Sequence, residues 1–392
     1  MKYKTKTLKY GLAGILSLAM AAAPAGTCLP GFLPAQALTV YAGPAEEATV
    51  SSDEPTGPAA LGQTQGLSAS NYYNVRLSDP IVKPVDKYSY EQMDRDIQAL
   101  KNRYPNQMTV NVIGQSADGR NLYDIIIGNP SASEHILFQG AIHAREYINV
   151  PLMMQQLEYL LACQNTGTFE GKSLSEMLGQ TAVHFVPLVN PDGISISQSG
   201  DGAIRSPELK AQIKACYEQD TAEGRTAADY DTYLKRWKSN GRGVDLNHNF
   251  DAGWSTLNTV GHPSSTDYKG TSPLSEPESK ALAALTDQYP FAVCINYHAM
   301  GQVIYWDTEN NRQTASSKEL AELVSKHNGY QILGSKGVGG YKDWLQQREK
   351  SIPGITIEVG KSACPVNFSE YETIREQNEA VPGLIIQYVI SH

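Results

Sequence analysis

The sequence has few cysteines, no excess of positive charge and no apolar run long enough to cross a bilayer. Its five cysteines form no Cys-x-x-Cys pair, which excludes a zinc knuckle and a dithiol redox motif. The net charge of −9 argues against nucleic acids and anionic membranes as partners, since both need a basic surface. The longest apolar run, residues 11–23, is shorter than the roughly 20 residues of a membrane-spanning helix. What remains is the composition of an ordinary globular protein.

The first 37 residues have the organisation of a secretory signal peptide. Four lysines precede the apolar run, and Ala35-Gln36-Ala37 provides a small-residue cleavage site. This segment holds no acid, so its removal takes away four positive charges and changes the net charge from −9 to −13. A lipoprotein signal at Cys28 and a retained amphipathic anchor are alternatives, but the first fits its pattern poorly and the second lacks a charged face. We expect a secreted protein cleaved near Ala37, with cell-wall association as an option.

The rest of the chain divides into a linker and one folded domain. Residues 38–71 are rich in small residues and proline and have almost no large apolar side chains, so we predict a disordered linker. Residues 72–392 contain no internal repeat and no second linker. A domain of this length is large but acceptable for an α/β enzyme. One catalytic domain is therefore predicted over 72–392.

Strand-like and helix-like segments alternate along this domain. Ser89 and Gln92 begin a capping box, and Asp118-Gly119 predicts a hairpin turn. Strands are predicted at 109–113, 122–127, 135–139, 183–189, 291–297 and 355–359, and helices at 89–104, 150–161, from 275–278, from 316–319 and at 371–390. The charged stretch 204–238 interrupts the alternation and is interpreted as a surface insertion. The alternation predicts an α/β fold, with a mixed, largely parallel twisted sheet covered by helices on both faces.

Two histidines and two glutamates lie at or near the ends of predicted strands. His143 and Glu146 follow the strand at 135–139, His298 follows a later strand, and Glu358 lies on the last one. Open α/β sheets place their sites on loops at strand ends. Two imidazoles and one carboxylate are common ligands of a catalytic zinc ion, and a further glutamate is its usual general base. The pattern predicts one zinc ion per chain held by His143, Glu146 and His298, with Glu358 as the base.

Five segments in this order resemble the zinc carboxypeptidase family, the carboxypeptidase A-like metallopeptidases. They are His143-Ala144-Arg145-Glu146, Pro187-Leu188-Val189-Asn190-Pro191-Asp192-Gly193, Gly243-Val244-Asp245-Leu246-Asn247-His248-Asn249, Asn296-Tyr297-His298 and Thr356-Ile357-Glu358-Val359. The resemblance runs from about Ser89 to the C-terminus. It implies the same three zinc ligands, with Glu358 moving a proton from the attacking water to the leaving nitrogen. It also implies that Asp245 orients a zinc-binding histidine, although Asp245 could instead cap the turn at 246–250.

The resemblance also implies a cation facing the metal, since hydrolysis develops an oxyanion. In the family this is an arginine just upstream of the Gly-Val-Asp segment, where this chain offers Arg242 and Lys238. We prefer Arg242, because the Trp-basic-x-polar run that precedes it, from Trp237 to Asn240, matches the family's segment if one inserted residue is allowed. Alternatively, Arg242 or Lys238 is only a solvated surface charge without a role in catalysis. We favour this alternative for Lys238.

Four residues are candidates for substrate binding. Asn247 and His248 match two positions that bind the substrate's C-terminal carboxylate in exopeptidases of the family. In those enzymes an arginine occupies the position of His248. Imidazole lacks arginine's bidentate clamp, which argues against strict carboxypeptidase action. Tyr341 and Lys342 fall at the pocket for the residue after the cut bond. Lys342 would favour an acidic side chain there, or would extend to solvent.

These departures favour the subgroup that cleaves bacterial cell-wall peptides between γ-D-glutamate and diaminopimelate. We expect a secreted, monomeric zinc metallopeptidase acting on peptides such as the peptidoglycan stem, without nucleic acid or stable membrane insertion. Three alternatives stay open: a carboxypeptidase releasing C-terminal amino acids from proteins, a zinc-dependent amidase of related fold, and a non-catalytic peptide-binding domain. The segments 190–193 and 243–247 argue against the amidase. The intact set of ligands and base argues against the binding domain.

Overall fold

The computed structural model describes residues 72–75, 77–334 and 339–392. The predicted signal peptide at 1–37 and linker at 38–71 lie outside the described residues. Within the described ranges, no helix is both long enough and apolar enough to pass through a bilayer.

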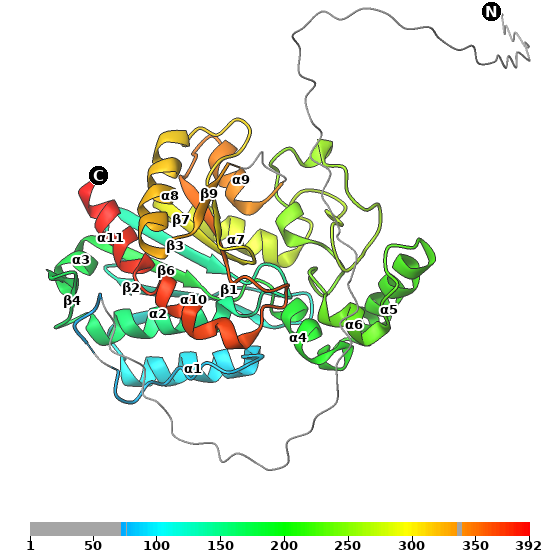
Figure 1. Ribbon diagram of the computed structural model, residues 1–392, viewed down its shortest axis with the longest axis horizontal. Helices are drawn as coiled ribbons and strands as arrows, with labels where there is room; N and C mark the ends of the chain where they lie inside the picture. Colours follow the sequence, from blue (N-terminus) through cyan, green and yellow to red (C-terminus); the bar gives the residue numbers. More distant parts are fainter. Residues whose placement is uncertain (1–71, 76, 335–338) are drawn as a thin grey trace, which may run out of the picture. The chain divides into compact units, whose positions relative to one another are not determined.

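The described residues form one mixed eight-stranded sheet with the strand order β1-β2-β6-β3-β7-β10-β8-β9 (Figure 1). The central strands β6, β3, β7 and β10 run parallel to one another, whereas β1–β2, β2–β6 and β10–β8 pair antiparallel. The strands, together with the separate hairpin β4–β5, are β1 Met108–Gln115, β2 Asn121–Gly128, β3 Glu134–Gly140, β4 Thr168–Phe169, β5 Lys172–Ser173, β6 Thr181–Val186, β7 Phe291–Ala299, β8 Val303–Tyr305, β9 Gln331–Leu333 and β10 Gly354–Val359. The predicted mixed, largely parallel sheet is confirmed.

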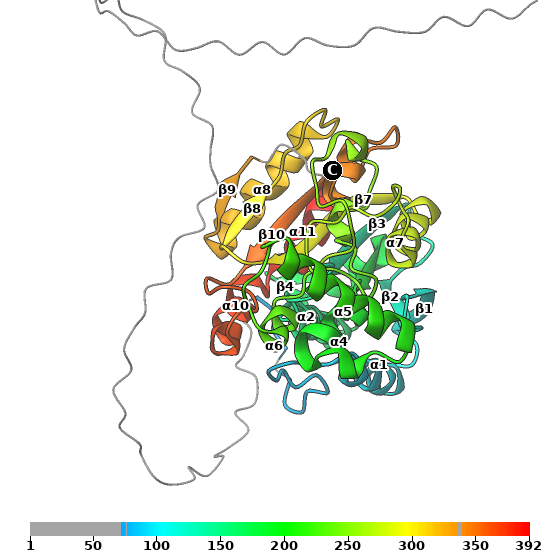
Figure 2. The same ribbon diagram turned by 90° about the vertical axis from the view of Figure 1, so that its right-hand side faces the viewer.

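Helices cover both faces of this sheet (Figures 1 and 2). They are α1 Tyr90–Arg103, α2 Asn149–Cys163, α3 Leu174–Gln180, α4 Pro191–Ser199, α5 Pro207–Ala222, α6 Tyr230–Lys235, α7 Pro277–Gln288, α8 Thr314–Asn328, α9 Tyr341–Gln347, α10 Tyr371–Asn378 and α11 Val381–Ser391. Buried side chains of α1, α2, α3, α8, α10 and α11 share the larger core, and those of α7 and α9 share a second one. Because neighbouring strand residues point to opposite faces, Ile136 and Phe138 join the larger core and Leu137 the second.

Local sequence signals set several element boundaries as expected. The Ser89 hydroxyl oxygen accepts a hydrogen bond from the Gln92 amide, and α1 begins at Tyr90. Gly119 has φ +78° in the turn between the antiparallel strands β1 and β2, a conformation that glycine adopts without strain. The predicted stretch 204–238 contains α5 and α6, which enclose a third small core around Trp237.

The prediction of one C-terminal helix over 371–390 is wrong. The structure has two helices, α10 and α11, separated at Glu379 and Ala380. Pro382 lies in the first turn of α11, where a missing backbone N–H leaves no helical hydrogen bond unmade. Proline therefore starts a second helix here instead of being tolerated inside a longer one.

The buried side chain of Asn190 joins three segments at the carboxyl end of the sheet. Its Oδ1 accepts a hydrogen bond from the Gly193 amide at 2.9 Å and so caps α4. Its Nδ2 donates to the carbonyl oxygens of Ile142, at 3.0 Å, and Ser239, at 3.1 Å. A Cβ on Gly193 would lie 2.4 Å from the Ser239 oxygen, so only glycine permits this approach. Asn190 thus fixes the residue before His143 against the segment that contains Lys238.

A buried ion-pair network attaches the β1–β2 turn to the same helix start. Asp192 accepts hydrogen bonds from the Ser116 hydroxyl at 2.7 Å, the Asp118 amide at 2.7 Å and the Arg120 guanidinium at 2.8 Å. Arg120 also pairs with the Asp118 carboxylate at 2.7 Å. Each buried charge therefore has partners of opposite sign or hydrogen-bond donors, as burial requires.

Asn190→Asp tests the bridge with almost no change of shape. The carboxylate offers no N–H to the carbonyls of Ile142 and Ser239 and places negative charge against both. We expect the free energy of unfolding to fall by about 3 kcal/mol, measured by chemical denaturation. The exposed Asn165→Asp is the control and should stay within about 0.5 kcal/mol of the wild type. Equal effects of the two variants would contradict the bridging role.

Candidate active site

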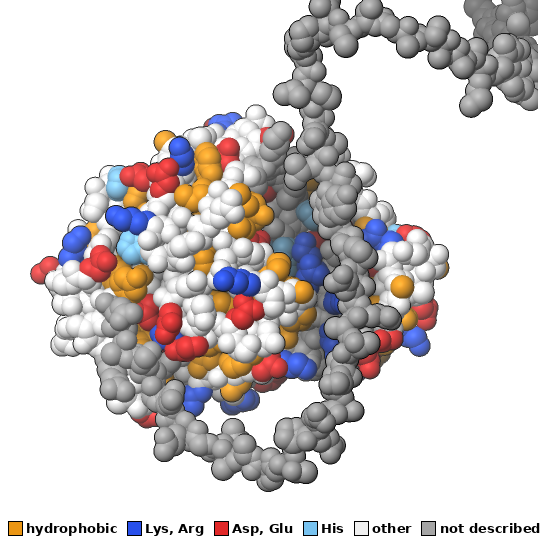
Figure 3. Space-filling model, in the orientation of Figure 1, with side chains coloured by type: hydrophobic (Ala, Val, Ile, Leu, Met, Phe, Trp, Pro, Cys, Tyr) orange, Lys and Arg blue, Asp and Glu red, His pale blue; other side chains and the backbone are white. Residues whose placement is uncertain are grey.

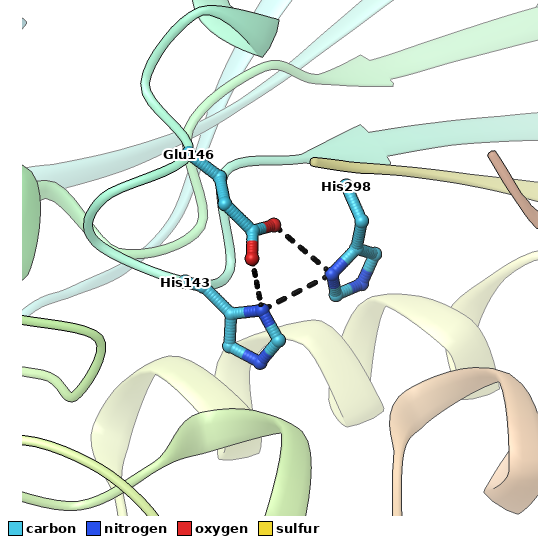
Figure 4. Close-up of side chains that lie close together, drawn as sticks. All are labelled: His143, Glu146 and His298. Atoms are coloured by element: carbon cyan, nitrogen blue, oxygen red, sulfur yellow. Dashed lines mark hydrogen bonds and ion pairs between the residues drawn. The ribbon is translucent and has the colours of Figure 1, made fainter. Parts of the chain in front are cut away.

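Three side chains that can bind a metal ion converge beyond the carboxyl ends of β3 and β7 (Figure 4). His143 Nδ1 lies 2.7 Å from Glu146 Oε1, and His298 Nδ1 lies 3.1 Å from Glu146 Oε2. The two Nδ1 atoms are 3.2 Å apart, and all three residues are buried. His143 and His298 are 155 positions apart in the sequence, and the fold brings them together.

The chemistry of these donors fits a zinc ion. His143 Nε2 lies 3.4 Å from Asp245 Oδ1, an arrangement that favours a hydrogen on Nε2 and leaves the Nδ1 lone pair facing Glu146 and His298. Two imidazole nitrogens and one carboxylate oxygen around one point are a common ligand set of catalytic zinc, which keeps a further position open. A cation there would also relieve the close approach of the two ring nitrogens.

Sheet register explains why the two histidines meet. β3 and β7 are parallel neighbours, with Gly140 paired to Tyr297, so the chain leaving β3 emerges beside His298. The loop then turns through a hydrogen bond from the Glu146 amide to the His143 carbonyl, and Glu146 Oε2 accepts from the Ala299 amide at 3.1 Å. The ligand carboxylate is therefore held by the strand that carries the second histidine.

Glu358 lies next to His298 because β10 is the parallel neighbour of β7 and these two residues are register partners. Burial raises the pKa of the Glu358 carboxyl to about 7, and the charge of Glu146 adds to this effect. His298, Lys238 and Arg145 act in the opposite direction and favour its ionised form. Glu358 is thus an acid that can take and release a proton near neutral pH.

The other two buried carboxylates of the site are held in the ionised form. Burial disfavours the charge of Glu146, but His143 and His298 outweigh burial and lower its pKa. Burial likewise acts on Asp245, yet Lys238 and His248 hold the pKa of Asp245 well below its usual range. The site therefore separates two permanent anions from one carboxyl that titrates.

The placement of the two candidate cations corrects the expectation for Arg242. Lys238 Nζ lies 2.9 Å from Asp245 Oδ2, and only 16% of its side chain is exposed. Arg242 is 45% exposed, and its guanidinium pairs with the Glu276 carboxylate at 3.8 Å. A hydrogen bond from the Ala144 amide to the Lys238 carbonyl at 3.0 Å fixes Lys238 beside the metal-binding loop. The sequence did contain a signal for Lys238. It follows Trp237 directly, so the Trp-basic pair matches the family's segment without an inserted residue.

Sequence reasoning also missed Arg145, which lies between two metal-binding residues. Its charge acts on the carboxyl of Glu358 and on the thiol of Cys364, so the guanidinium lies near the site. Within the described part of the chain its guanidinium makes no hydrogen bond or ion pair, and its Nε is buried without a partner.

A cavity of about 200 Å³ opens beside the metal-binding residues. It is lined by His143, His298, Glu358, Gln139, Asn247, Asn296, Tyr305, Gly340, Tyr341, Lys342, Asp343 and Thr356. Figure 3 shows Lys and Arg side chains gathered near histidine side chains on the face beside the part of the domain that carries α4 to α6. The position and lining suit one substrate side chain next to the reacting centre.

His248 and Tyr341 are two of the four predicted substrate-binding residues, and of these two only Tyr341 lines the cavity. His248 lies 3.4 Å from Asp245 Oδ2 and lines a separate hollow with Leu257 and Asp267. The Tyr341 hydroxyl is hydrogen-bonded to Thr286 at 2.6 Å inside the second core. Tyr341 therefore lines the cavity while its hydroxyl is hydrogen-bonded to Thr286, and substrate contact by His248 stays a prediction.

Asn247 and Lys342 also line the cavity, each with partners of its own. Asn247 Oδ1 accepts from the Tyr341 amide at 3.1 Å. Lys342 Nζ donates to Asp307 O at 2.8 Å, Asp343 Oδ1 at 2.6 Å and Gln346 Oε1 at 3.3 Å. Since Lys342 is only 6% exposed, the alternative that it extends to solvent is wrong. Its charge is balanced by Asp343 inside the cavity wall.

Comparisons with known proteins agree with this geometry. Residues 93–377 match the model of the zinc carboxypeptidase family. Gamma-D-glutamyl-L-diamino acid endopeptidase 1 of Lysinibacillus sphaericus is 34% identical over 306 residues, which cover 77% of this chain and 73% of the relative.

Solved structures show the same fold at low identity. The crystal structure of thrombin activatable fibrinolysis inhibitor superposes with a TM-score of 0.62 at 19% identity, over 80% of this chain and 78% of that one. Carboxypeptidase A from Helicoverpa armigera superposes with a TM-score of 0.57 at 19% identity, over 79% of this chain and 77% of that one. With the family model matching most of the chain, this protein belongs to the zinc carboxypeptidase family and is a zinc metallopeptidase.

Proposed function

We propose that this protein is an exported peptidase that hydrolyses bacterial cell-wall peptides at the bond between γ-D-glutamate and a diamino acid. The observation that carries the proposal is Glu358 as register partner of His298, beside a cluster that suits one zinc ion. The relative named for γ-D-glutamyl-L-diamino acid cleavage supports the choice of substrate. Export rests on the signal-peptide pattern of residues 1–37.

Each polar residue of the site has a task in this hydrolysis. Zinc, when bound by His143, Glu146 and His298, lowers the pKa of water and polarises the substrate carbonyl. Glu358 takes a proton from the attacking water and delivers it to the leaving nitrogen. Asp245 holds the imidazole of His143 in one orientation through Nε2.

Lys238 is the cation that we assign to the developing oxyanion. It is held on Asp245 beside the metal-binding loop, and its charge acts on both Glu146 and Glu358. Burial disfavours the charged ammonium, but Asp245 outweighs burial and raises the pKa of Lys238. Lys238 therefore stays positive through the reaction, as an oxyanion partner must.

The cavity chemistry supports a diamino acid on the leaving side. The Lys342–Asp343 pair presents one cation and one anion to the cavity. A simple acidic side chain would find the charge of Lys342 already balanced, so the earlier expectation of acidic preference is revised. The side-chain end of diaminopimelate carries an ammonium and a carboxylate and can match both partners.

Glu358→Gln tests the assignment of the base. The amide cannot take a proton, whereas the three metal-binding residues are unchanged, so we expect one zinc per chain and a fall in kcat of about 1,000-fold or more. Metal content by elemental analysis and turnover are measured on the same sample. Exposed Glu349→Gln is the control and should keep both. Retained turnover would exclude the role of base, and lost zinc would make Glu358 a ligand.

Lys238→Met and Arg242→Met decide between the two cations. Lys238→Met removes the charge beside the metal and should lower kcat by about 100-fold. Arg242→Met removes a half-exposed charge and should lower kcat by at most about threefold, as expected of a solvated charge. Circular dichroism and zinc content separate loss of folding from loss of catalysis. A larger loss in Arg242→Met than in Lys238→Met would restore the original assignment.

Product analysis by mass spectrometry tests the substrate. The purified enzyme is incubated with L-Ala-γ-D-Glu-meso-diaminopimelate and, separately, with peptides ending in Phe or Lys. We expect release of diaminopimelate to be the fastest reaction, because the cavity presents charges of both signs. Faster release of Phe or Lys would favour a general carboxypeptidase.

A further inference from the structure

Polar side chains form one row across the floor of the cavity beside the metal-binding residues. Register pairing places Gln139 of β3 beside Asn296 of β7, and Asn296 beside Thr356 of β10. Thr356 is in turn the register partner of Tyr305 on β8, and all four residues line the cavity. Since Leu137 packs in the core that contains side chains of α7 and α9, alternation along β3 points Gln139 to the same face. An apolar substrate side chain would meet this floor without matching its polar groups.

A chain of hydrogen bonds determines which atom of the Gln139 amide is not used by the protein. Asn296 Nδ2 donates to the Ile355 carbonyl at 2.9 Å, so Asn296 Oδ1 is the acceptor on the side of Gln139. Gln139 Nε2 donates to that oxygen at 2.8 Å. Gln139 Oε1 is buried and has no hydrogen-bond partner among the residues that the structure describes. Because an unmatched buried amide oxygen is costly, this atom favours a bound molecule that donates a hydrogen bond.

Two other acceptors in the cavity wall already have donors from the protein. Asn247 Oδ1 accepts from a backbone amide at 3.1 Å, and Asp343 Oδ1 accepts from the Lys342 ammonium at 2.6 Å. An ammonium that enters the cavity therefore gains a new hydrogen bond at Gln139 Oε1, whereas at Asp343 it competes with Lys342.

The depth of this oxygen matches the length of a diamino acid. Asn296, the register partner of Gln139, precedes the metal-binding His298 by two residues on β7, so the polar row lies about 7 Å deeper than the reacting centre. The side-chain ammonium of diaminopimelate lies up to about 6 Å from its Cα along the extended chain. We propose that Gln139 Oε1 accepts a hydrogen bond from this ammonium and so selects a diamino acid on the leaving side of the cut bond. The inference rests on the proposed function and adds the residue that recognises the second amino group.

A purely structural role for Gln139 is the competing interpretation, because its amide also joins β3 to β7 through Asn296. Loss of a contact between strands would lower activity toward all substrates alike, through folding or zinc content. Loss of a substrate contact lowers kcat/KM only for substrates that carry the amino group.

Two peptides that differ only in the second amino group separate these roles. One is L-Ala-γ-D-Glu-meso-diaminopimelate, and the other ends in L-2-aminopimelate, in which a hydrogen replaces that amino group. For the wild type we expect kcat/KM to be about 10- to 100-fold higher for the diaminopimelyl peptide. Gln139→Met removes the acceptor with little change in side-chain length, and the ratio should fall to within about threefold of one.

Gln139→Glu is the matched variant, because it keeps an oxygen acceptor at the same place. It should keep the ratio at or above the wild-type value, even where the new carboxylate lowers stability. Exposed Gln180→Met is the control and should leave the ratio unchanged. Because both peptides are measured on the same protein, misfolding or zinc loss lowers both rates and leaves the ratio unchanged.

An unchanged ratio in Gln139→Met overturns the inference, as does equal cleavage of both peptides by the wild type. If Gln139→Met does not fold, Gln139→Glu decides, since a ratio near one in that variant overturns the inference and a preserved ratio supports it. A wild type that cleaves neither peptide overturns the proposed function itself.

Discussion

The amide of Asn190 is the constraint on which the site depends. Parallel register brings β3, β7 and β10 side by side, but the residues that follow β3 still need a fixed path. Asn190 provides it by donating to Ile142, next to His143, and to Ser239, next to Lys238. One buried side chain thereby sets the distance between the metal-binding loop and its facing cation. Backbone pairing of Ala144 with Lys238 adds a second attachment.

This geometry divides the charges of the site into fixed and titrating groups. The histidines and Lys238 keep Glu146 and Asp245 ionised, whereas burial raises the pKa of Glu358 to about 7. Groups with different tasks in one catalytic centre are often separated in this way by their surroundings. A ligand and an orienting acid need a permanent charge, but a base must accept and release a proton within each turnover.

Local signals in the sequence predicted more of the fold than of the substrate site. Capping at Ser89, the turn at Asp118-Gly119 and the strand-end spacing of the histidines depend on near neighbours, so they could be recognised directly. Lys238 was ranked below Arg242, because the long-range hydrogen bonds to Ala144 and Ser265 that hold it at the site form only in the folded chain. The surroundings of His248 and Tyr341 could not be predicted for the same reason, since Asp245 and Thr286 meet them only in the folded chain. Pro382 was misjudged because its effect depends on where the helix begins.

Arg145 is tied to the metal-binding loop by the chain itself. It is covalently tied to His143 and Glu146 within four residues, so a shift of its backbone also shifts a metal-binding side chain. Lys342, by contrast, belongs to α9, and its ammonium is held by Asp343 and Gln346 from that same helix. Selectivity on the leaving side can therefore change by substitution in α9 with little effect on the metal cluster.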